Sequence, residues 1–561
     1  MINNLSLYVK SKENWPRLVA LLAGMVAIVY SIYFYFANCY DAIATKKTNF
    51  YYAAIFIVMI AVVVYLLTVI MKGKEWNYPR TFVIMALGWT FCMQLVMPPI
   101  SGVDEVQHFY SAYHCSNIMM GMKDHNLSMD TSRPMTWVEG ESFFYMRGED
   151  YNMLPYVDVT FPYQYPILAN GNWITHYEDQ EGLVECKINP TRASRYLVSG
   201  VGITIARLLG FGFSGVVFLG RFMNSLSLII AGWIALKLLP VGKLQFVTFA
   251  LFPTVLSLCS SYSYDNMSIL FSLALLTLCL YYSQDQVKLH AWDLIILAGC
   301  VIMLVPNKTV YALFAVWIFA IPVKKWWKDV VLSKKWYEYV ILGILGTGAV
   351  AVGYKVIRVY YWYVVANVVW RTPGVAMIEQ DPSKSAYTIY DIYDNPLGTL
   401  KFAWEGIKVD FWYNIKHIVG SEIGHVMLNA QVPMFCVITM LLCLIVGLFI
   451  VKGKRIKKWQ MVIIGIGLFL CVAAIFIGCL SRFTPAEGSQ RIQISFRYLI
   501  PVYMCMCIAL GSDAKEDNKQ LALIYIQNIA LVFSMCGLLY FLFHLRDGME
   551  APEILKGILG Q

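Results

Sequence analysis

Long apolar runs separated by short basic loops are the feature that most limits what this chain of 561 residues can fold into. A helix needs about 20 mostly apolar residues to cross the hydrocarbon core of a bilayer. Hydrophobic residues make up 59% of the sequence and charged residues only 14%, a composition that a soluble surface would not tolerate. The sequence therefore predicts an all-α polytopic membrane protein in a lipid bilayer and excludes a soluble enzyme.

Eleven apolar runs are long enough to cross, and two shorter ones, at 291–304 and 308–322, are also predicted to do so. This gives about 13 transmembrane helices. A further apolar stretch, 196–209, is predicted to be a juxtamembrane helix that does not cross, because a crossing there would break the parity of the loops. The long runs lie near 17–37, 50–71, 80–99, 213–238, 243–258, 264–282, 337–365, 432–451, 459–479, 495–511 and 521–543.

The distribution of basic residues predicts the orientation of these helices. The formal net charge is +9, and the lysines and arginines gather in short loops, above all at 324–335 and 452–458. Short basic loops stay in the cytoplasm, so both loops and the N-terminus are predicted to be cytoplasmic. The basic charge therefore reports topology and does not indicate a nucleic-acid partner.

The same rule places a large loop, residues 100–212, outside the cytoplasm, between spans 3 and 4. Between residues 100 and 190 it holds thirteen acidic residues and four basic ones, the composition of a loop that is free to be translocated. The predicted organisation is three transmembrane helices in 1–99, the extracytoplasmic loop 100–212 with juxtamembrane helices, transmembrane helices in 213–365, a second extracytoplasmic loop 366–431, and C-terminal transmembrane helices in 432–561.

Cysteine usage indicates packing more than redox chemistry. Most of the 14 cysteines lie inside apolar runs, where cysteine behaves as a small hydrophobic residue. Cys115 and Cys186 flank the large loop, and the sequence leaves open whether they form a disulfide.

Two adjacent carboxylates follow the third apolar run. Asp104 and Glu105 stand at the start of an amphipathic stretch that ends near Met120 and is predicted to be a helix along the membrane surface. They are either functional groups or acids that stabilise the positive end of that helix. Asp104 and His108 are four residues apart on one helical face, which suits a divalent metal, but two ligands are too few to define a site.

Three short turns on the predicted outer side also carry charged side chains, namely Asp265, Lys308, and the pair Arg491 and Arg497. Each has an ordinary explanation, since Asp265 can cap a helix, Lys308 can reach the headgroups, and arginines can bind lipid phosphate nonspecifically. Basic residues on outward turns nevertheless run against the positive-inside bias. As a set they indicate a function such as binding an anionic headgroup.

These segments resemble the motifs of a large family of bacterial membrane proteins of unknown function. Residues 103–109 (VDEVQHF) resemble its P-D-E-P-x-H-F motif, with differences at the first and fourth positions. Residues 263–267 are similar to its S-x-D turn, 308–311 to its K-x-x-Y segment, and 497–501 to its G-R-Y-F-x-P motif, where Phe496 replaces the glycine. The resemblance covers nearly the whole chain in order.

That family is similar in layout to the GT-C glycosyltransferases, integral membrane enzymes that take a sugar from a polyprenyl-phosphate carrier. The resemblance implies a GT-C-like fold in which Asp104 matches the catalytic acid of the first large outer loop. Here that loop follows the third span instead of the first. Glu105 and His108 would orient Asp104 or complete a metal site, and Tyr264 and Asp265 would bind a sugar hydroxyl or the acceptor.

A lipid-linked donor carries its phosphate at the level of the headgroups, where cationic side chains can hold it by charge-assisted hydrogen bonds. The residues expected to do so are Lys308, Arg491, Arg497 and Tyr498. Asp104 would act as general base on the acceptor hydroxyl, a role that suits a partly buried carboxylate, and direct displacement would invert the anomeric carbon.

The expected function is therefore a glycosyltransferase that uses a polyprenyl-phosphate-linked sugar and a glycan acceptor on the extracytoplasmic side of a bacterial cytoplasmic membrane, in polysaccharide biosynthesis. A transporter or flippase for lipid-linked glycans is the first alternative, and a noncatalytic partner in the same pathway is the second. Few charges fall within spans, with Arg221 and Arg358 the most conspicuous, so the charged path that a transporter needs is not evident.

Overall fold

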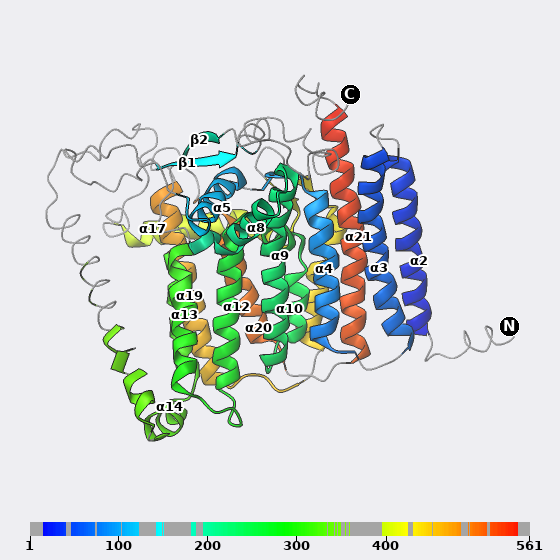
Figure 1. Cartoon of the computed structure of the whole chain (residues 1–561). Helices are drawn as coiled ribbons and strands as arrows, with labels where there is room; N and C mark the ends of the chain where they lie inside the picture. Colours follow the sequence, from blue (N-terminus) through cyan, green and yellow to red (C-terminus); the bar gives the residue numbers. More distant parts are fainter. Residues whose placement is uncertain are drawn as a thin grey trace. The chain divides into compact units, whose positions relative to one another are not determined.

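Helices account for nearly all of the regular structure in the described part of the chain, shown by the computed structural model in Figure 1. The structure describes residues 15–40, 46–72, 76–102, 104–122, 142–147, 150, 181–186, 194–333, 335–341, 343–344, 346–348, 354, 358, 395–424, 430–450, 453–483, 492, 494–512 and 517–547. The chain divides into two compact units, which are described separately below.

Unit 1 comprises Met1–Leu270, Lys416–Arg455 and Cys507–Gln561. Its helices are α2 (Trp15–Phe34), the π-helical turn η2 (Tyr35–Cys39), α3 (Lys46–Lys72), α4 (Tyr78–Val96), α5 (Glu105–Met119), α8 (Leu197–Leu208), α9 (Phe213–Leu238), α10 (Lys243–Ala250), α11 (Pro253–Cys259), the start of α12 (Asp265–Tyr282), α18 (Met434–Ile450) and α21 (Asn518–Asp547). Two antiparallel strand pairs belong to it, β1 (Ser142–Arg147) with β2 (Glu181–Cys186), and β3 (Glu422–Ile423) with β4 (Ala430–Gln431).

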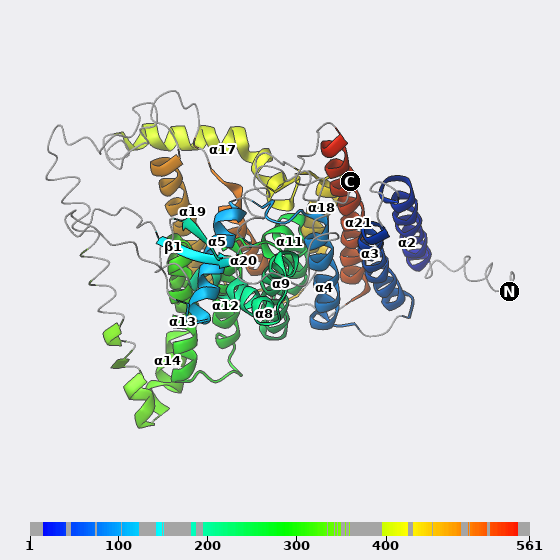
Figure 2. The same ribbon diagram turned by 45° about the horizontal axis from the view of Figure 1, so that its top comes forward.

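Unit 2 comprises Phe271–Ile415 and Ile456–Met506. It contains most of α12, then α13 (Ala291–Asn307), the 3₁₀ helix η5 (Thr309–Ala320), α14 (Val323–Asp329), η6 (Val331–Ser333), most of α17 (Pro396–Val419), all of α19 (Lys458–Phe483), η9 (Phe496–Leu499) and the start of α20 (Ile500–Leu510). Within this unit, α17 runs across the direction of α13 and α19 (Figures 1 and 2).

Among the described residues, seven helices are long and apolar enough to cross a membrane, or eight if the bent pair η5 and α14 counts as one span. They confirm the predicted all-helical, multi-pass membrane protein. Three shorter apolar helices, α13, α18 and the stretch Phe496–Leu510, coincide with other predicted runs. The predicted span at 243–258 is instead two short helices, α10 and α11, neither of which is long enough to cross by itself. The total of about 13 stays a prediction, because the run at 337–365 lies largely outside the described residues.

Helix α8 occupies the ambiguous apolar stretch. Its twelve residues extend about 18 Å, well short of the roughly 30 Å of hydrocarbon that a span must cross. It is amphipathic, with Gly202 and Ile203 on its buried face and Leu208 exposed. A β-carbon on Gly202 would come within 2.5 Å of the Leu219 carbonyl oxygen, so glycine lets α8 pack closely on α9. These features agree with a juxtamembrane helix.

Buried polar side chains connect the helices of unit 1. The indole Nε1 of Trp89 on α4 donates to Asn528 Oδ1 on α21, at 2.5 Å. Gln527 Nε2, also on α21, donates to the carbonyl oxygen of Thr248 on α10. Apolar side chains pack as well against lipid as against each other, so such interhelical bonds help to specify which helices pair.

Cys115 lies buried in α5 as a free thiol. Burial raises the pKa of this thiol to about 11, which keeps it protonated and poorly reactive. The structure thus gives no support to a disulfide at Cys115. The other twelve cysteines whose side chains are described are also free and buried, as expected of small apolar residues, and the side chain of Cys186 is not among them.

The 3₁₀ helix η5 is built on a period of three. Tyr311, Phe314, Trp317 and Ala320 are buried, and the residues between them are not. A 3₁₀ helix has three residues per turn, so side chains at this spacing stand directly above one another. The rings of Phe314 and Trp317 stack with centroids 4.0 Å apart, and Trp317 Nε1 donates to the Ile464 carbonyl oxygen of α19 at 3.1 Å. We call this row the aromatic ladder.

Replacing Gly467 of α19 with alanine is expected to lower the thermal unfolding midpoint of the purified protein in detergent. The new β-carbon would lie 2.4 Å from Trp317 Nε1, and the ring cannot retreat without leaving its stack and its hydrogen bond. Overpacking of this kind costs about 1–3 kcal/mol.

Gly465→Ala, two residues earlier on the same helix, is the matched control. Its β-carbon would meet nothing within 4 Å, so the better helix propensity of alanine should leave stability unchanged or raise it by up to about 1 kcal/mol. Equal shifts for the two variants would contradict the packing described for the aromatic ladder.

Candidate functional site

The connection from α4 to α5 carries the Asp104 motif. It begins with a tight turn, in which both the amide and the hydroxyl of Ser101 donate to the carbonyl oxygen of Pro98. Two residues here adopt left-handed backbone conformations, Ile100 at φ 59° and Asp104 at φ 57°. Such a conformation is uncommon for residues other than glycine and is a true outlier for β-branched isoleucine. Each costs about 1–3 kcal/mol and persists only where the surroundings impose it.

The carboxylate of Glu105, the first residue of α5, is buried and fully used. Its Oε1 accepts from Arg221 Nε and from the backbone amide of Tyr262, both at 2.9 Å. Its Oε2 accepts from Arg221 Nη2 at 2.9 Å and from the amide of Gly102 at 2.7 Å. The side chains of Glu105 and Arg221 are only 1% and 2% exposed. This is a bidentate buried ion pair, in which both carboxylate oxygens are satisfied.

Arg221 extends the network to the end of α4. Its Nη1 donates to the Met97 carbonyl oxygen at 3.2 Å, and its Nη2 donates to that of Pro98 at 3.0 Å. Arg221 lies on α9, a candidate span, where an unpaired charge would be costly. The guanidinium therefore joins α9, the end of α4 and the start of α5 at one point.

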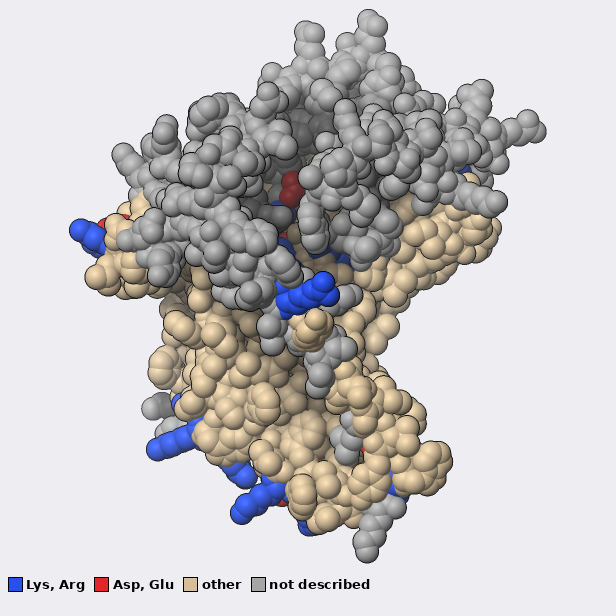
Figure 3. Space-filling view, turned by 90° about the vertical axis from the view of Figure 1, so that its left-hand side faces the viewer, with Lys and Arg blue, Asp and Glu red and all other residues tan. Residues whose placement is uncertain are grey.

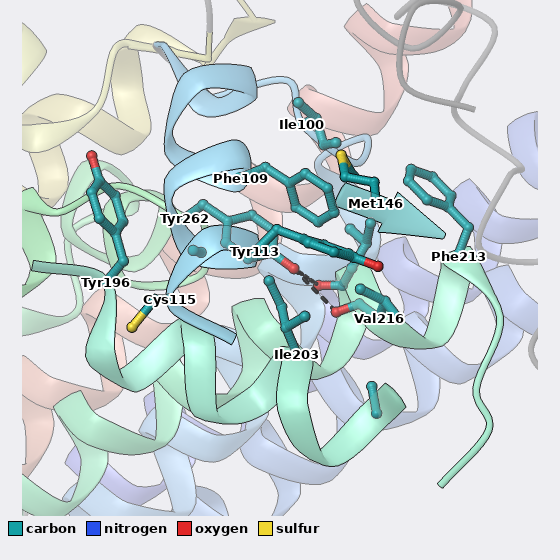
Figure 4. Close-up of a cluster of buried hydrophobic side chains, with 13 residues drawn as sticks. Ile100, Phe109, Tyr113, Cys115, Met146, Tyr196, Ile203, Phe213, Val216 and Tyr262 are labelled. Atoms are coloured by element: carbon teal, nitrogen blue, oxygen red, sulfur yellow. Dashed lines mark hydrogen bonds between the residues drawn. The ribbon is translucent and has the colours of Figure 1, made fainter. Parts of the chain in front are cut away.

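Ile100 is held by packing. Its side chain belongs to a buried cluster formed by α5, β1, α8, α9 and the turn before α12, and shown in Figure 4. Burying an isoleucine side chain contributes about 1.5–3 kcal/mol, which is enough to offset the strained backbone at this residue. The cluster consists of Ile100, Phe109, Ala112, Tyr113, Cys115, Met146, Tyr196, Ile203, Ala206, Phe213, Val216, Val217 and Tyr262.

Asp104 is exposed, in contrast to its buried neighbour Glu105. The expectation of a partly buried base at this position is therefore wrong, because Glu105 takes the inward direction and Asp104 is turned outward. Asp104 occupies the N-cap position of α5, but its side chain makes no capping hydrogen bond. The explanation of Asp104 as an acid at the positive end of α5 agrees with this position, although it involves no capping hydrogen bond.

His108, one turn into α5, is brought against two tyrosines. Its Nδ1 lies 2.9 Å from the hydroxyl oxygen of Tyr196, and its ring meets that of Tyr264 edge to face at 5.0 Å. Arg195 lies over the ring of Tyr264, with its Cζ 4.8 Å from the ring centroid. His108 is buried, whereas Arg195 and Tyr264 are half-buried. The structure thus joins the two predicted residues His108 and Tyr264 in one group.

The turn before α12 is held by Tyr262. Its hydroxyl donates to the carbonyl oxygens of Val216 and Val217 on α9, both at 3.1 Å, and burial raises the pKa of this phenol well above its usual value (Figure 4). Asp265, which begins α12, is 3% exposed, and its amide donates to Ser263 Oγ. Because the amide of Tyr262 also binds Glu105, this turn is fixed directly to the start of α5.

Strand β1 is fastened to α5 by one buried carboxylate. Asp150 Oδ2 accepts from the hydroxyl of Tyr113 and from Arg147 Nε, each at 2.8 Å. Arg207 lies over the ring of Tyr113, with its Cζ 4.5 Å from the ring centroid. Burial raises the pKa of Tyr113, so the phenol stays protonated and keeps its bond to Asp150. The described part of the large loop is thereby anchored to the helix that carries Asp104.

In unit 2, the structure brings together three of the four residues predicted to bind phosphate. Lys308 Nζ lies 3.6 Å from the ring centroid of Tyr498, and Arg497 Cζ lies 5.4 Å from it. The hydroxyl of Tyr311, the first rung of the aromatic ladder, donates to the Tyr498 carbonyl oxygen at 2.8 Å. Arg491 lies outside the described residues. The result is a half-buried pair of cations on one aromatic ring.

No group of three or more His, Cys, Asp and Glu side chains suited to a metal occurs among the described residues. Both oxygens of Glu105 are already engaged, so it offers no ready third ligand beside Asp104 and His108. The metal alternative therefore has no complete ligand set in that part of the chain.

Two residues of the site were not identified as such from the sequence. Arg221 was noted only as a charge within a span, yet a charged residue there requires a partner, and Glu105 is a nearby acid in the predicted topology. Tyr196 stood in a stretch interpreted only by its hydropathy. The sequence contains no pattern that would have paired it with His108.

A family model described as a predicted membrane protein, DUF2142, matches residues 191–506 of the chain. The matched region includes Tyr264, Asp265, Lys308 and Arg497 but begins after Asp104. No curated protein and no solved structure matches the chain.

Replacing Arg221 with methionine is expected to lower the free energy of unfolding by about 3–5 kcal/mol, because the charge of Glu105 would stay buried without its partner. Combining it with Glu105→Gln should recover part of that loss, since no buried charge remains. Thermal unfolding in detergent measures both.

Arg80→Met is the control, because Arg80 is an exposed arginine on α4. It should change stability by less than about 1 kcal/mol. If Arg221→Met behaves like Arg80→Met, the buried pair does not have the structural importance assigned to it.

Proposed function

The chain belongs to the DUF2142 family of predicted membrane proteins, and on that premise we propose that it is a membrane glycosyltransferase. It transfers a sugar from a polyprenyl-phosphate donor to a glycan acceptor on the extracytoplasmic side of the membrane. One observation carries the proposal: Asp104 is held exposed in a strained left-handed conformation, next to a buried ion pair that fixes the backbone.

Strain of this kind supports a functional role for Asp104. A carboxylate in the left-handed region is tolerated at functional sites because the surrounding structure imposes it. The pair of Glu105 and Arg221 supplies that constraint. Arg221 binds Glu105 at the start of α5 and the carbonyl oxygen of Pro98 just after α4. A side chain directed outward by a rigid backbone is pre-organised to meet a substrate.

In the proposed reaction, Asp104 accepts the proton of an acceptor hydroxyl as that oxygen attacks the anomeric carbon. The bond between this carbon and the carrier phosphate breaks, and its electron pair leaves with the phosphate. A single displacement inverts the anomeric configuration. An exposed carboxylate can act as a general base if its hydrogen bond to the acceptor hydroxyl is well oriented.

Glu105 has a positioning role in this proposal. Its four hydrogen bonds leave it no capacity to take up a proton without loss of the ion pair. His108 lies one helical turn from Asp104 and contacts Tyr264, and this aromatic edge and phenol suit the faces and hydroxyls of a sugar ring. Asp265 is assigned to the acceptor or to a sugar hydroxyl.

The donor phosphate is assigned to Lys308, Arg497 and Tyr498, with Arg491 as a further candidate. Lys308 and Arg497 both lie against the ring of Tyr498, and both can direct N–H groups to phosphate oxygens. They would also stabilise the negative charge that develops on the departing phosphate. The transport alternative is weakened, because Arg221, a charge within a span, is engaged by Glu105.

Asp104→Asn is expected to abolish transfer while leaving the fold intact, since asparagine tolerates the left-handed backbone but cannot accept the proton. The test is mass spectrometry of the surface glycans of a deletion strain complemented with wild type or variant, at equal amounts of protein in the membrane. The variant strain should lack a sugar that the wild type restores.

Asp285→Asn, the same substitution at an exposed aspartate between α12 and α13, is the control and should restore the glycan. Restoration of the same glycan by Asp104→Asn would exclude Asp104 as the base. Accumulation of a complete lipid-linked glycan at the cytoplasmic face in the deletion strain would favour the flippase alternative.

Lys308→Met is expected to weaken binding of polyprenyl phosphate, the group common to every donor of this class, by roughly 10- to 100-fold. This corresponds to the loss of one hydrogen bond to a charged group, about 1.5–3 kcal/mol. Binding to the purified protein in detergent can be titrated by native mass spectrometry. Lys288→Met, at an exposed lysine of unit 2, should leave the affinity unchanged. Equal affinities for all three proteins would remove Lys308 from the donor site.

A further inference from the structure

A second basic and aromatic surface lies at the opposite end of η5 from Lys308. Helix α14 follows η5 after a break at Ile321 and Pro322, and the two helices are bent by 72°. If η5 crosses the membrane, α14 must turn away from the membrane normal and run near the plane of the interface. Lys and Arg side chains gather toward the lower end of the face in Figure 3, the end at which α14 lies in Figure 1.

The exposed face of α14 has an apolar edge and a basic edge. Val323 and Trp327, four residues apart, form the apolar edge and are 75% and 60% exposed. Lys324 and Lys328, also four apart and both exposed, form the basic edge beside it. An amphipathic helix with tryptophan on one side and lysine on the other is the pattern of helices that lie in the membrane interface.

Two contacts fix which face of α14 is exposed. Lys325 donates from Nζ to the Gln284 carbonyl oxygen, and Asp329 Oδ2 accepts from the amide of Leu289 at 3.2 Å. Both partners belong to the turn between α12 and α13. Asp329, the one acidic residue of α14, is thus engaged in holding the helix to this turn. Lys324 and Lys328, in contrast, are exposed.

The same character continues beyond α14. Leu332 is exposed, and Trp336 is 76% exposed and follows Lys335. Exposed large apolar side chains and exposed lysines therefore occur both on α14 and in the segment after it. We call Val323, Lys324, Trp327, Lys328, Lys335 and Trp336 the α14 surface.

We propose that the α14 surface binds the headgroups of anionic phospholipids in the leaflet that it faces. In this arrangement the tryptophan rings lie in the membrane–water interface at the level of the headgroups, and the lysines contact lipid phosphates. Charge complementarity selects this occupant, because a neutral lipid surface gives no advantage to a row of outward lysines. The inference does not depend on the proposed glycosyltransferase activity.

The position of this surface gives lipid binding a structural consequence. The twelve residues of η5 extend about 24 Å at the 3₁₀ rise of roughly 2.0 Å per residue, which covers most of the roughly 30 Å hydrocarbon core. One end of η5 is therefore tied to the headgroups through α14, and the other leads directly to Lys308. Anionic lipid at α14 holds η5, and Lys308 with it, at a defined depth.

The test is a titration of the full-length protein in detergent with phosphatidylglycerol, followed by native mass spectrometry, with phosphatidylcholine as the neutral lipid. Lys324→Gln combined with Lys328→Gln is expected to weaken phosphatidylglycerol binding about 25-fold at low salt, or about fivefold for each lysine. Affinity for phosphatidylcholine should not change. High salt should reduce the wild-type affinity toward that of the variant.

Lys401→Gln combined with Lys408→Gln on α17 is the matched control, because both lysines are exposed and the change in net charge is identical. It should keep at least half of the wild-type affinity. The proposal is overturned if the α14 variant binds phosphatidylglycerol as the wild type does, if the control loses as much, or if wild-type binding does not respond to salt. A lower melting temperature of the α14 variant does not affect these comparisons, since the lipid titration is made well below it.

Discussion

The buried ion pair between Glu105 and Arg221 is the interaction on which the described part of unit 1 around Asp104 depends. It joins three helices and one turn, since its hydrogen bonds reach α9, the end of α4, the start of α5 and the amide of Tyr262. Removing two charges from water costs several kcal/mol for each, and the attraction between them offsets this only when every remaining donor and acceptor is paired. Here both carboxylate oxygens and all three guanidinium nitrogens have partners. The pair is therefore better understood as a determinant of geometry than as a source of net stability.

That geometry gives neighbouring residues opposite environments. Glu105 is nearly inaccessible and Asp104 is exposed, although they are adjacent in the chain. Asp104 has a left-handed backbone conformation directly before α5, and the buried side chain of Ile100 keeps the preceding turn in place. Solvent exposure and structural anchoring are thus separated between two adjacent residues.

The sequence predicted the elements of this protein better than their connections. Apolar runs located the helices, because burial in lipid requires hydrophobic residues in stretches of known length. The meeting of Lys308 with Arg497 and Tyr498 was also predicted, because basic residues on outward turns are unusual. Glu105 and Arg221, however, are 116 positions apart, and no local pattern connects them. Backbone strain at Ile100 and Asp104 likewise arises from tertiary contacts. The aromatic residues of η5 do repeat every third position, but a window that averages hydropathy over a whole span conceals that period.

The aromatic ladder also restricts how η5 can move. A 3₁₀ helix that slid along α19 by one or two residues would turn Phe314 and Trp317 away from the groove at Gly467. Only a shift of three residues, about 6 Å along the axis, would place a new set of side chains in the same line. Intermediate positions would lose the stacking and the hydrogen bond of Trp317 together. The helix therefore has a discrete register, and Lys308 at its start can change height only in whole steps.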